Sequence, residues 1–288
     1  MRFEDFAKAH GLIINHVVAH KQMRTPTSDK PHSRNGSYKY TGDFGFVMNW
    51  ATMAEPAIWF ADDSTTNFNT ANVNDLFSSL SKLDKKVASD KASKKAGWIM
   101  HQAKTDYHKY LSDKGFPLEV GAVWKTNGQS LLVIPMRIDK RLVGCQLINN
   151  NGDKKFLYGQ TTKRAVFTFN AKGVPIFCEG FATGLSIREV LKASNIKYCI
   201  YVCFSATNME LVSRDFRHGL VVADNDASKV GETSAMKTGK PYWISDTLGE
   251  DFNDYHKRVG TKIASVALKE KLQSLGMVCL LYTSPSPR

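Results

Sequence analysis

Short apolar runs alternate with amphipathic stretches between residues 172 and 260, and this alternation constrains the fold more than any other feature of the 288-residue chain. The apolar runs predict four buried strands, at 174–178, 198–204, 220–223 and 242–244. The amphipathic stretches predict helices, at 182–193, 208–216 and 232–237. Strands that alternate with helices pair in parallel through crossover connections. The sequence therefore predicts an α/β domain over 172–278 with a mostly parallel four-stranded sheet.

Acidic residues follow two of the predicted strands, at the edge of a parallel sheet where ligands collect. Glu179 comes directly after the strand at 174–178, and Asp224 and Asp226 come directly after the strand at 220–223. Residues two apart on an extended backbone point the same way, so we expect both aspartates to face one point.

Such a group of carboxylates suits a divalent cation. Two carboxylates about 4 Å apart repel by roughly 4 kcal/mol at an effective dielectric constant near 20, and a bound cation reverses that cost. Oxygen ligands favour Mg²⁺ or Mn²⁺. Taken singly, each acid also has an ordinary structural explanation, with 224–226 as a solvated turn and Glu179 as favourable charge at a helix N-terminus.

Taken together, three motifs in this order resemble the toprim family. They are E-G-F-A-T-G at 179–184, A-D-N-D at 223–226 with Gly231 five positions further on, and D-F-N-D at 251–254. The set is similar to the toprim domain of DNA primases encoded by phages and plasmids. Toprim domains serve topoisomerases, primases and some nucleases, with a glutamate as acid or base and a D-x-D pair that holds magnesium.

The resemblance implies roles for four positions of this chain. It makes Glu179 the catalytic acid or base, Asp224 and Asp226 the metal ligands, and Asp251 a further carboxylate of the metal site. It also implies Mg²⁺, or Mn²⁺, as the cofactor.

Residues 116–171 are expected to form a small β-rich lobe of α+β type ahead of the toprim domain. Segments 132–137 and 152–159 are similar to the small lobe of primases, and 108–116 is similar to the beginning of the primase catalytic core. Gln160 is a departure, because relatives tend to have paired glycines at this point.

Three cations of this lobe are expected to face the phosphates of the nucleotide or the template: Arg137, Lys154 and Lys155. Ordinary surface charge on a sheet edge is the alternative for each of them.

Residues 1–80 predict an α+β N-terminal region that can bind nucleic acid. A short helix at 4–10 precedes a stretch at 24–40 that mixes cations with aromatic residues, and Asn35-Gly36 predicts a hairpin turn. Such a surface can stack bases and hold the phosphates of a single strand, although a solvated hairpin is the alternative. The segment 81–115 is lysine-rich and predicted to be helical, either as a solvated face or as a nucleic-acid track.

The overall charge fits a polyanionic partner, because 39 Lys and Arg residues stand against 27 Asp and Glu residues, for a net charge of +12. The five cysteines contain no C-x-x-C pair, which argues against a disulfide framework and a zinc ribbon. No run approaches the roughly 18 apolar residues that cross a bilayer. We therefore expect a cytoplasmic protein of a bacterial host cell, without a membrane partner.

The last ten residues, 279–288, do not continue the helical pattern at 262–272 that precedes them. They resemble the translated read-through of a sequencing adapter. We therefore expect the natural chain to depart from this one near Cys279, and we exclude the tail from the predicted fold.

The resemblance to toprim primases implies a DNA primase, a nucleotidyltransferase that synthesises RNA primers on single-stranded DNA in phage or mobile-element replication. Its expected partners are a single-stranded DNA template, ribonucleoside triphosphates and a replicative helicase, fused or separate. Two alternatives stay open: a toprim nuclease, and a non-catalytic accessory protein that binds single-stranded nucleic acid.

Overall fold

The structure, a computed structural model, describes residues 1–61, 70–170 and 172–278. The expected read-through tail at 279–288 lies outside the described residues. The chain forms two compact units, Met1–Phe77 and Ser78–Arg288, which are described separately below.

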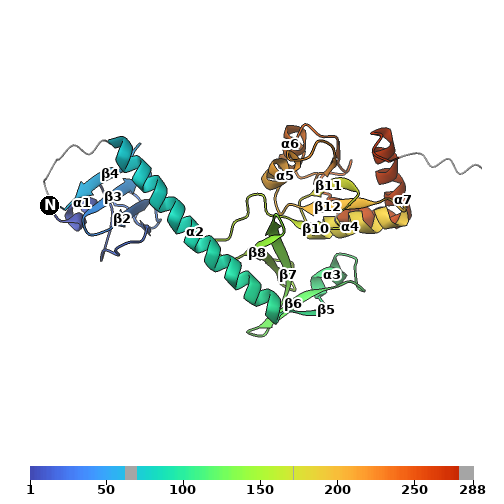
Figure 1. The fold of residues 1–288 in the computed structure, drawn as a ribbon, viewed down its shortest axis with the longest axis horizontal. Helices are drawn as coiled ribbons and strands as arrows, with labels where there is room; N and C mark the ends of the chain where they lie inside the picture. Colours follow the sequence, from blue (N-terminus) through green and yellow to red (C-terminus); the bar gives the residue numbers. More distant parts are fainter. Residues whose placement is uncertain (62–69, 171, 279–288) are drawn as a thin grey trace, which may run out of the picture. The chain divides into compact units, whose positions relative to one another are not determined.

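The C-terminal part of the second unit is an α/β domain (residues 167–278) built on a five-stranded sheet (Figure 1). Its strands, in spatial order, are β10 (Phe167–Phe169), β12 (Tyr198–Val202), β11 (Val174–Cys178), β13 (Leu220–Val222) and β14 (Tyr242–Trp243). The last four pair in parallel, whereas β10 pairs with β12 in antiparallel fashion. The sequence predicted four strands and missed β10, because a three-residue edge strand is too short to show an alternating pattern.

Helices cover both faces of this sheet (Figure 1). They are α4 (Phe181–Ala193) and α7 (Phe252–Ser274) on one face, and α5 (Ala206–Ser213) and α6 (Val230–Lys237) on the other. Strand β11 divides the two cores, because Ile176 and Cys178 pack toward α4 while Phe177 packs toward α5. Helix α7 starts ten residues before the helix predicted at 262–272, with a non-helical backbone at Gly260.

The small lobe (residues 104–156) is a five-stranded antiparallel sheet. Its strands, in spatial and chain order, are β5 (Lys104–Tyr107), β6 (Val120–Thr126), β7 (Gln129–Ile138), β8 (Arg141–Ile148) and β9 (Lys154–Phe156). The short helix α3 (Lys109–Asp113) lies between β5 and β6 in the chain. One face of the sheet, with Leu132 and Ile134, joins the core of the α/β domain. The lobe and the α/β domain therefore share one hydrophobic core.

The other face of the lobe packs against the C-terminal half of helix α2 (Thr70–Gln102), where Ala96 and Ile99 contact Val133 and Cys145. The helix expected at 81–115 ends at Gln102, and residues 104–107 form β5 instead. Pairing with β6 outweighs the weak local preference for helix at these positions.

The N-terminal unit packs helix α1 (Phe3–Ala9) on a four-stranded antiparallel sheet. Its strands are β1 (Met23–Thr25), β2 (Gly36–Tyr40), β3 (Phe44–Asn49) and β4 (Ala57–Phe60). The hairpin turn predicted at Asn35-Gly36 is wrong, because Gly36 lies in β2 and pairs with Thr25 and Asn49. A Cβ atom at Gly36 would lie 2.9 Å from the Thr27 Cγ2 atom, so the glycine serves close packing.

The stretch at 24–40 is less exposed than its composition suggested. Tyr38 is in the core of the N-terminal unit, and Lys39 is also buried. An exposed pair remains, in which the Arg24 guanidinium lies 5.2 Å from the ring centroid of Trp50. The broad aromatic surface expected for base stacking is therefore not formed by residues 38–40.

Among the described residues, no helix combines the length and the apolar character that crossing a membrane requires.

Candidate active site

A small cavity of about 130 Å³ lies where the small lobe meets the C-terminal ends of β11 and β13. Its lining residues are Tyr110, Lys114, Gln146, Lys154, Glu179, Gly180, Ala182, Thr183, Phe204, Asp224 and Asp251. We call it the acidic cavity, because three carboxylates from separate parts of the chain line it. Two cations lie beside them.

Each of the three acids occupies the end of an element. Glu179 follows β11, and its carbonyl accepts a hydrogen bond from the Phe204 backbone N–H at 2.9 Å. Asp224 follows the end of β13 at Val222 after one further buried residue, Ala223. Asp251 is the N-cap of α7, where its carboxylate accepts from the Asp254 N–H at 2.8 Å. Parallel strands deliver the first two to one edge of the sheet, and the cap of α7 adds the third.

Burial and mutual repulsion make Asp224 the most perturbed of these acids. Burial in the cavity, followed by the charges of Asp251 and Glu179, raises the pKa of Asp224 to about 7, against the opposing effect of Lys154. The pKa of Glu179 is also raised, mainly by burial. One carboxylate oxygen of Asp224, Oδ1, is buried without a hydrogen-bond partner. Such an oxygen is costly unless a ligand satisfies it.

Asp226 takes a different direction from Asp224. Its carboxylate accepts from the backbone N–H groups of Val230 at 3.4 Å and Gly231 at 3.3 Å, and from the Ser228 hydroxyl. It therefore caps the beginning of α6 and does not line the acidic cavity. The strand ends at Val222, so its alternation does not carry both aspartates into the cavity, although the Asp226 charge still acts on Glu179 and Asp224. The metal-binding role expected for Asp226 stays a prediction.

Gly231 keeps this loop close to the helix. A Cβ atom at Gly231 would lie 2.3 Å from the Asp224 carbonyl oxygen, so no other residue fits there without a shift of the backbone. The glycine of the A-D-N-D motif thus lets the Asp224 loop lie directly against α6.

The donor set fits a hard divalent cation, since an unpartnered carboxylate oxygen of Asp224 lies in one cavity with Glu179 and Asp251. Within the described residues, no three His, Cys, Asp or Glu side chains converge closely enough to form a complete metal site. The acids that would hold the ion are thus gathered in one place without forming a closed shell.

The three predicted cations are divided between different places. Lys154 lines the acidic cavity. Lys155 pairs with Leu147, which belongs to the core beneath α2, and so lies on the opposite face of the lobe. Arg137 lines a separate cavity of about 780 Å³, and its guanidinium donates to the Lys140 carbonyl at 3.1 Å. Of these three predicted cations, Lys154 alone lies in the same cavity as the acids.

Three polar residues of the cavity were not predicted from the sequence: Tyr110, Lys114 and Gln146. The Tyr110 hydroxyl is buried without a partner, and burial together with the charge of Asp251 raises the pKa of Tyr110 to about 12. Lys114 lies 4.0 Å from the Asp254 carboxylate. The sequence pattern could have indicated Gln146 as a site residue, because it is a polar residue within the mostly apolar strand β8.

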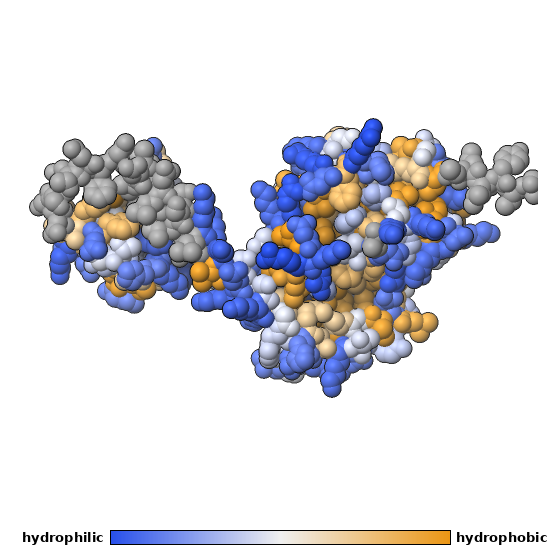
Figure 2. Space-filling view, in the orientation of Figure 1, coloured by the Kyte–Doolittle hydropathy of each residue, from blue (hydrophilic) through white to orange (hydrophobic). Residues whose placement is uncertain are grey.

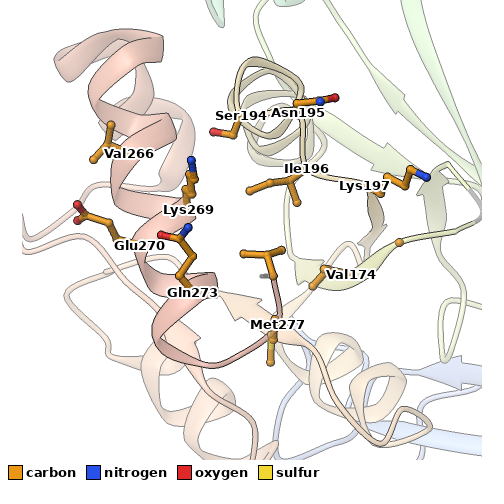
Figure 3. A pocket seen from close by; sticks show the side chains of 12 residues that line it. Val174, Ser194, Asn195, Ile196, Lys197, Val266, Lys269, Glu270, Gln273 and Met277 are labelled. Atoms are coloured by element: carbon orange, nitrogen blue, oxygen red, sulfur yellow. The ribbon is translucent and has the colours of Figure 1, made fainter. Parts of the chain in front are cut away.

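A further cavity, of about 770 Å³, lies at the opposite end of the sheet from the acids (Figure 3). Figure 3 shows Lys269 and Gln273 of α7 facing it across from Ile196. The described residues that line it include a single carboxylate, Glu270. This cavity lacks the acidic character of the candidate site.

The chain was also compared with known protein families, curated proteins and solved structures. Residues 175–262 match the family model described as "Toprim domain". No curated protein matches the chain.

Two solved structures are similar in part. One is the primase fragment of the bacteriophage T7 primase-helicase protein, with 13% sequence identity and a TM-score of 0.43 over 61% of this chain and 77% of that chain. The other is the bacteriophage T7 lagging-strand DNA polymerase interacting with primase domains of two gp4 subunits bound to an RNA/DNA hybrid and dTTP. It has 13% identity and a TM-score of 0.43, over 61% of this chain and 95% of that chain.

Proposed function

Because this chain contains a toprim domain at 175–262, we propose that it is a primase-type nucleotidyltransferase that synthesises RNA primers on single-stranded DNA, in the replication of a phage or mobile element. The observation that carries the proposal is the unpartnered Asp224 oxygen, in one cavity with two further carboxylates and two lysines. The combination suits a triphosphate that arrives with its divalent cation.

The acids provide the metal-binding side of the proposed site. Asp224 would hold Mg²⁺ together with Asp251, and the ion would supply neutralisation of the triphosphate charge for in-line attack. Glu179 suits proton transfer, because its raised pKa makes it a better acceptor for the proton of an attacking hydroxyl than an ordinary carboxylate.

The lysines provide the anion-binding side. Lys154 of β9 and Lys114, just after α3, line the same cavity as the acids. Phosphate oxygens between them would gain attraction from both ammonium groups. We propose Lys154 and Lys114, in place of Arg137 and Lys155, as the residues that orient the nucleotide.

The exposed face of α2 is the proposed track for the template. Lys91, Lys94, Lys95 and Trp98 are exposed and lie within about two turns of the helix, whereas Ala92 and Ala96 in the same turns are buried. Figure 2 shows mostly hydrophilic side chains along the part of α2 that is not grey. Trp98 is 55% exposed and is held edge-on by Trp124, with ring centroids 5.7 Å apart. Lysines that attract phosphates beside an open indole ring match a single strand with accessible bases.

Primer synthesis tests the proposal directly. Purified protein is incubated with single-stranded DNA templates, Mg²⁺ and labelled ribonucleotides, and the products are resolved by length. We expect Mg²⁺-dependent primers from the natural sequence, loss of at least about 100-fold of activity in Asp224→Asn, and full activity in Asp246→Asn, whose side chain is exposed outside the cavity. Absence of primers on every template, with a replicative helicase added, would overturn the proposal.

The same preparation separates the two alternatives. Mg²⁺-dependent cutting of plasmid without primer synthesis would identify a nuclease. DNA binding that is unchanged in Asp224→Asn, without either reaction, would identify a binding protein.

Template binding is tested by fluorescence anisotropy over a range of salt concentrations. We expect Lys95→Gln to lower the slope of log affinity against log salt by about 0.7, and Trp98→Ala to weaken binding by about 1 to 3 kcal/mol. Lys262→Gln on α7 is the matched control for an exposed lysine elsewhere. Equal effects of the α2 variants and the control would rule out this track.

A further inference from the structure

The Tyr110 side chain has a buried hydroxyl group without a hydrogen-bond partner, although buried polar groups normally have one. The residue is 4% exposed, its ring belongs to the core shared by the lobe and the α/β domain, and it lines the acidic cavity. Its hydroxyl is buried and forms no hydrogen bond with any described residue. A buried hydroxyl without a partner destabilises the folded state, so a phenylalanine would be the better residue if packing were its sole role.

The backbone around Tyr110 is firmly held. The Tyr110 N–H donates to His108 Nδ1 at 3.2 Å, and His108 Nε2 lies 3.1 Å from the Ser130 carbonyl of β7. At the other end, the Tyr110 carbonyl accepts from the Lys114 N–H at 3.0 Å. The backbone that carries the ring is therefore held by a short capped helix beside the lobe sheet, and the ring itself packs in the shared core.

The acidic cavity contains two unsatisfied atoms of opposite hydrogen-bonding character. The Asp224 Oδ1 atom can accept or bind a cation, and the Tyr110 hydroxyl can donate. Lys114 and Lys154 add positive charge on the same lining. A single ligand satisfies all of them if it combines anionic oxygens with a divalent cation, as a nucleoside triphosphate does with Mg²⁺.

We propose that Tyr110 is a substrate-binding residue whose hydroxyl donates a hydrogen bond to a phosphate oxygen of the incoming nucleoside triphosphate. This inference rests on the proposed function, because it takes the nucleotide as the ligand of the cavity. It adds a neutral donor to the two lysines and assigns the unpartnered hydroxyl a role that packing does not explain.

The test compares Tyr110→Phe with the natural sequence in two measurements. Binding of Mg·ATP without template is measured by isothermal titration calorimetry, and we expect the variant to bind about tenfold more weakly. The melting temperature without nucleotide is expected to be equal or higher, because the substitution removes a buried polar atom that has no partner. Tyr158→Phe is the matched control, since Tyr158 is 97% exposed.

The two possible failures are distinguishable. Unchanged Mg·ATP affinity with a lowered melting temperature would show that the hydroxyl has a structural partner, and would overturn the inference even if primers are made. Weakened Mg·ATP binding in Tyr110→Phe, in a protein that makes no primers, would support the inference and remove the primase proposal. In an active enzyme we expect the KM for ribonucleotides to rise more than kcat falls.

Discussion

The Arg188 guanidinium of helix α4 donates to both carboxylate oxygens of Glu119, at 2.9 and 2.6 Å, and so links the α/β domain to the small lobe. Both side chains are largely shielded from solvent, with 14% and 29% exposed. Arg188 also lies 5.3 Å from the ring centroid of Phe169 in β10. The Arg188 guanidinium of α4 therefore contacts both the edge strand β10 and the small lobe. All three belong to the unit that contains the acidic cavity.

Glu119→Gln is expected to destabilise the protein by about 1 to 2 kcal/mol, because a shielded bidentate pair loses its charge. The guanidinium holds the pKa of Glu119 below its ordinary value. The contribution of the pair is therefore complete above the unfolded pKa, near 4.5, and is lost as pH falls through the lowered folded pKa. Urea unfolding at pH 7 and pH 4 measures both effects. Asp5→Asn, in the exposed Arg2–Asp5 pair, is the control and is expected to leave the stability essentially unchanged, because solvent screens this pair.

Asp224→Asn is expected to stabilise the metal-free protein at pH 8, by up to about 4 kcal/mol. The pKa of Asp224 is raised from 3.8 to about 7 in the folded protein, so the folded state binds more protons than the unfolded state between these values. Stability from this group therefore decreases as pH rises from about 4 to 7. Unfolding in EDTA across this range measures the effect, with Asp246→Asn as control. A variant less stable than the natural protein at pH 8 would contradict the cost assigned to the buried carboxylate.

Asp226→Ala is expected to have the opposite effect in EDTA, a loss of about 1 kcal/mol. Its carboxylate caps the beginning of α6 through Val230 and Gly231, and removal of a cap leaves these N–H groups without a protein partner. Hydrogen exchange at the first turn of α6 locates the effect. Equal exchange in the variant and the natural protein would show that the carboxylate does not stabilise the helix.

Gly144→Ala and Gln160→Ala are expected to be coupled. The Gln160 Oε1 atom accepts from the N–H groups of Cys145 at 3.0 Å and Leu157 at 3.2 Å, and a Cβ atom at Gly144 would lie 2.3 Å from it. Each substitution alone is expected to cost about 1 to 3 kcal/mol. In the double variant the two closest contacts, with the Gln160 Oε1 and Cδ atoms, are removed and only the Cβ contact at 3.0 Å remains. The loss is therefore expected to be at least about 1 kcal/mol smaller than the sum, as measured by a double-mutant cycle. An additive result would show that the loop does not depend on this contact.

The positions of two site residues, Glu179 and Asp224, could be predicted from the sequence, because both follow parallel strands of one sheet. The carboxyl ends of parallel strands meet at one edge of a sheet, which is why Glu179 and Asp224, far apart in the chain, line one cavity. The toprim resemblance, confirmed by the family model, was needed to add Asp251, since an acid at a helix N-cap has an ordinary explanation. The catalytic and metal-binding roles of these acids stay predictions.

Other parts depend on packing that a single sequence does not encode locally. Adjacent residues of a strand point to opposite faces, so Lys154 and Lys155 could not both reach the acids, but only the packing of the lobe shows which one does. Tyr110 carries no periodic signal, because α3 has only five residues. Asp226 was misplaced because strand alternation was extended past Val222, where the loop turns toward α6.

The cap that Asp226 forms on α6 has a consequence for how the site would respond to ions. An ion that recruits the Asp226 carboxylate has to compete with the hydrogen bonds that this carboxylate accepts from the first turn of the helix. Ion binding by Asp226 and fraying of the first turn of α6 would then be thermodynamically coupled. Each kcal/mol of capping energy that is lost would weaken the ion affinity about fivefold.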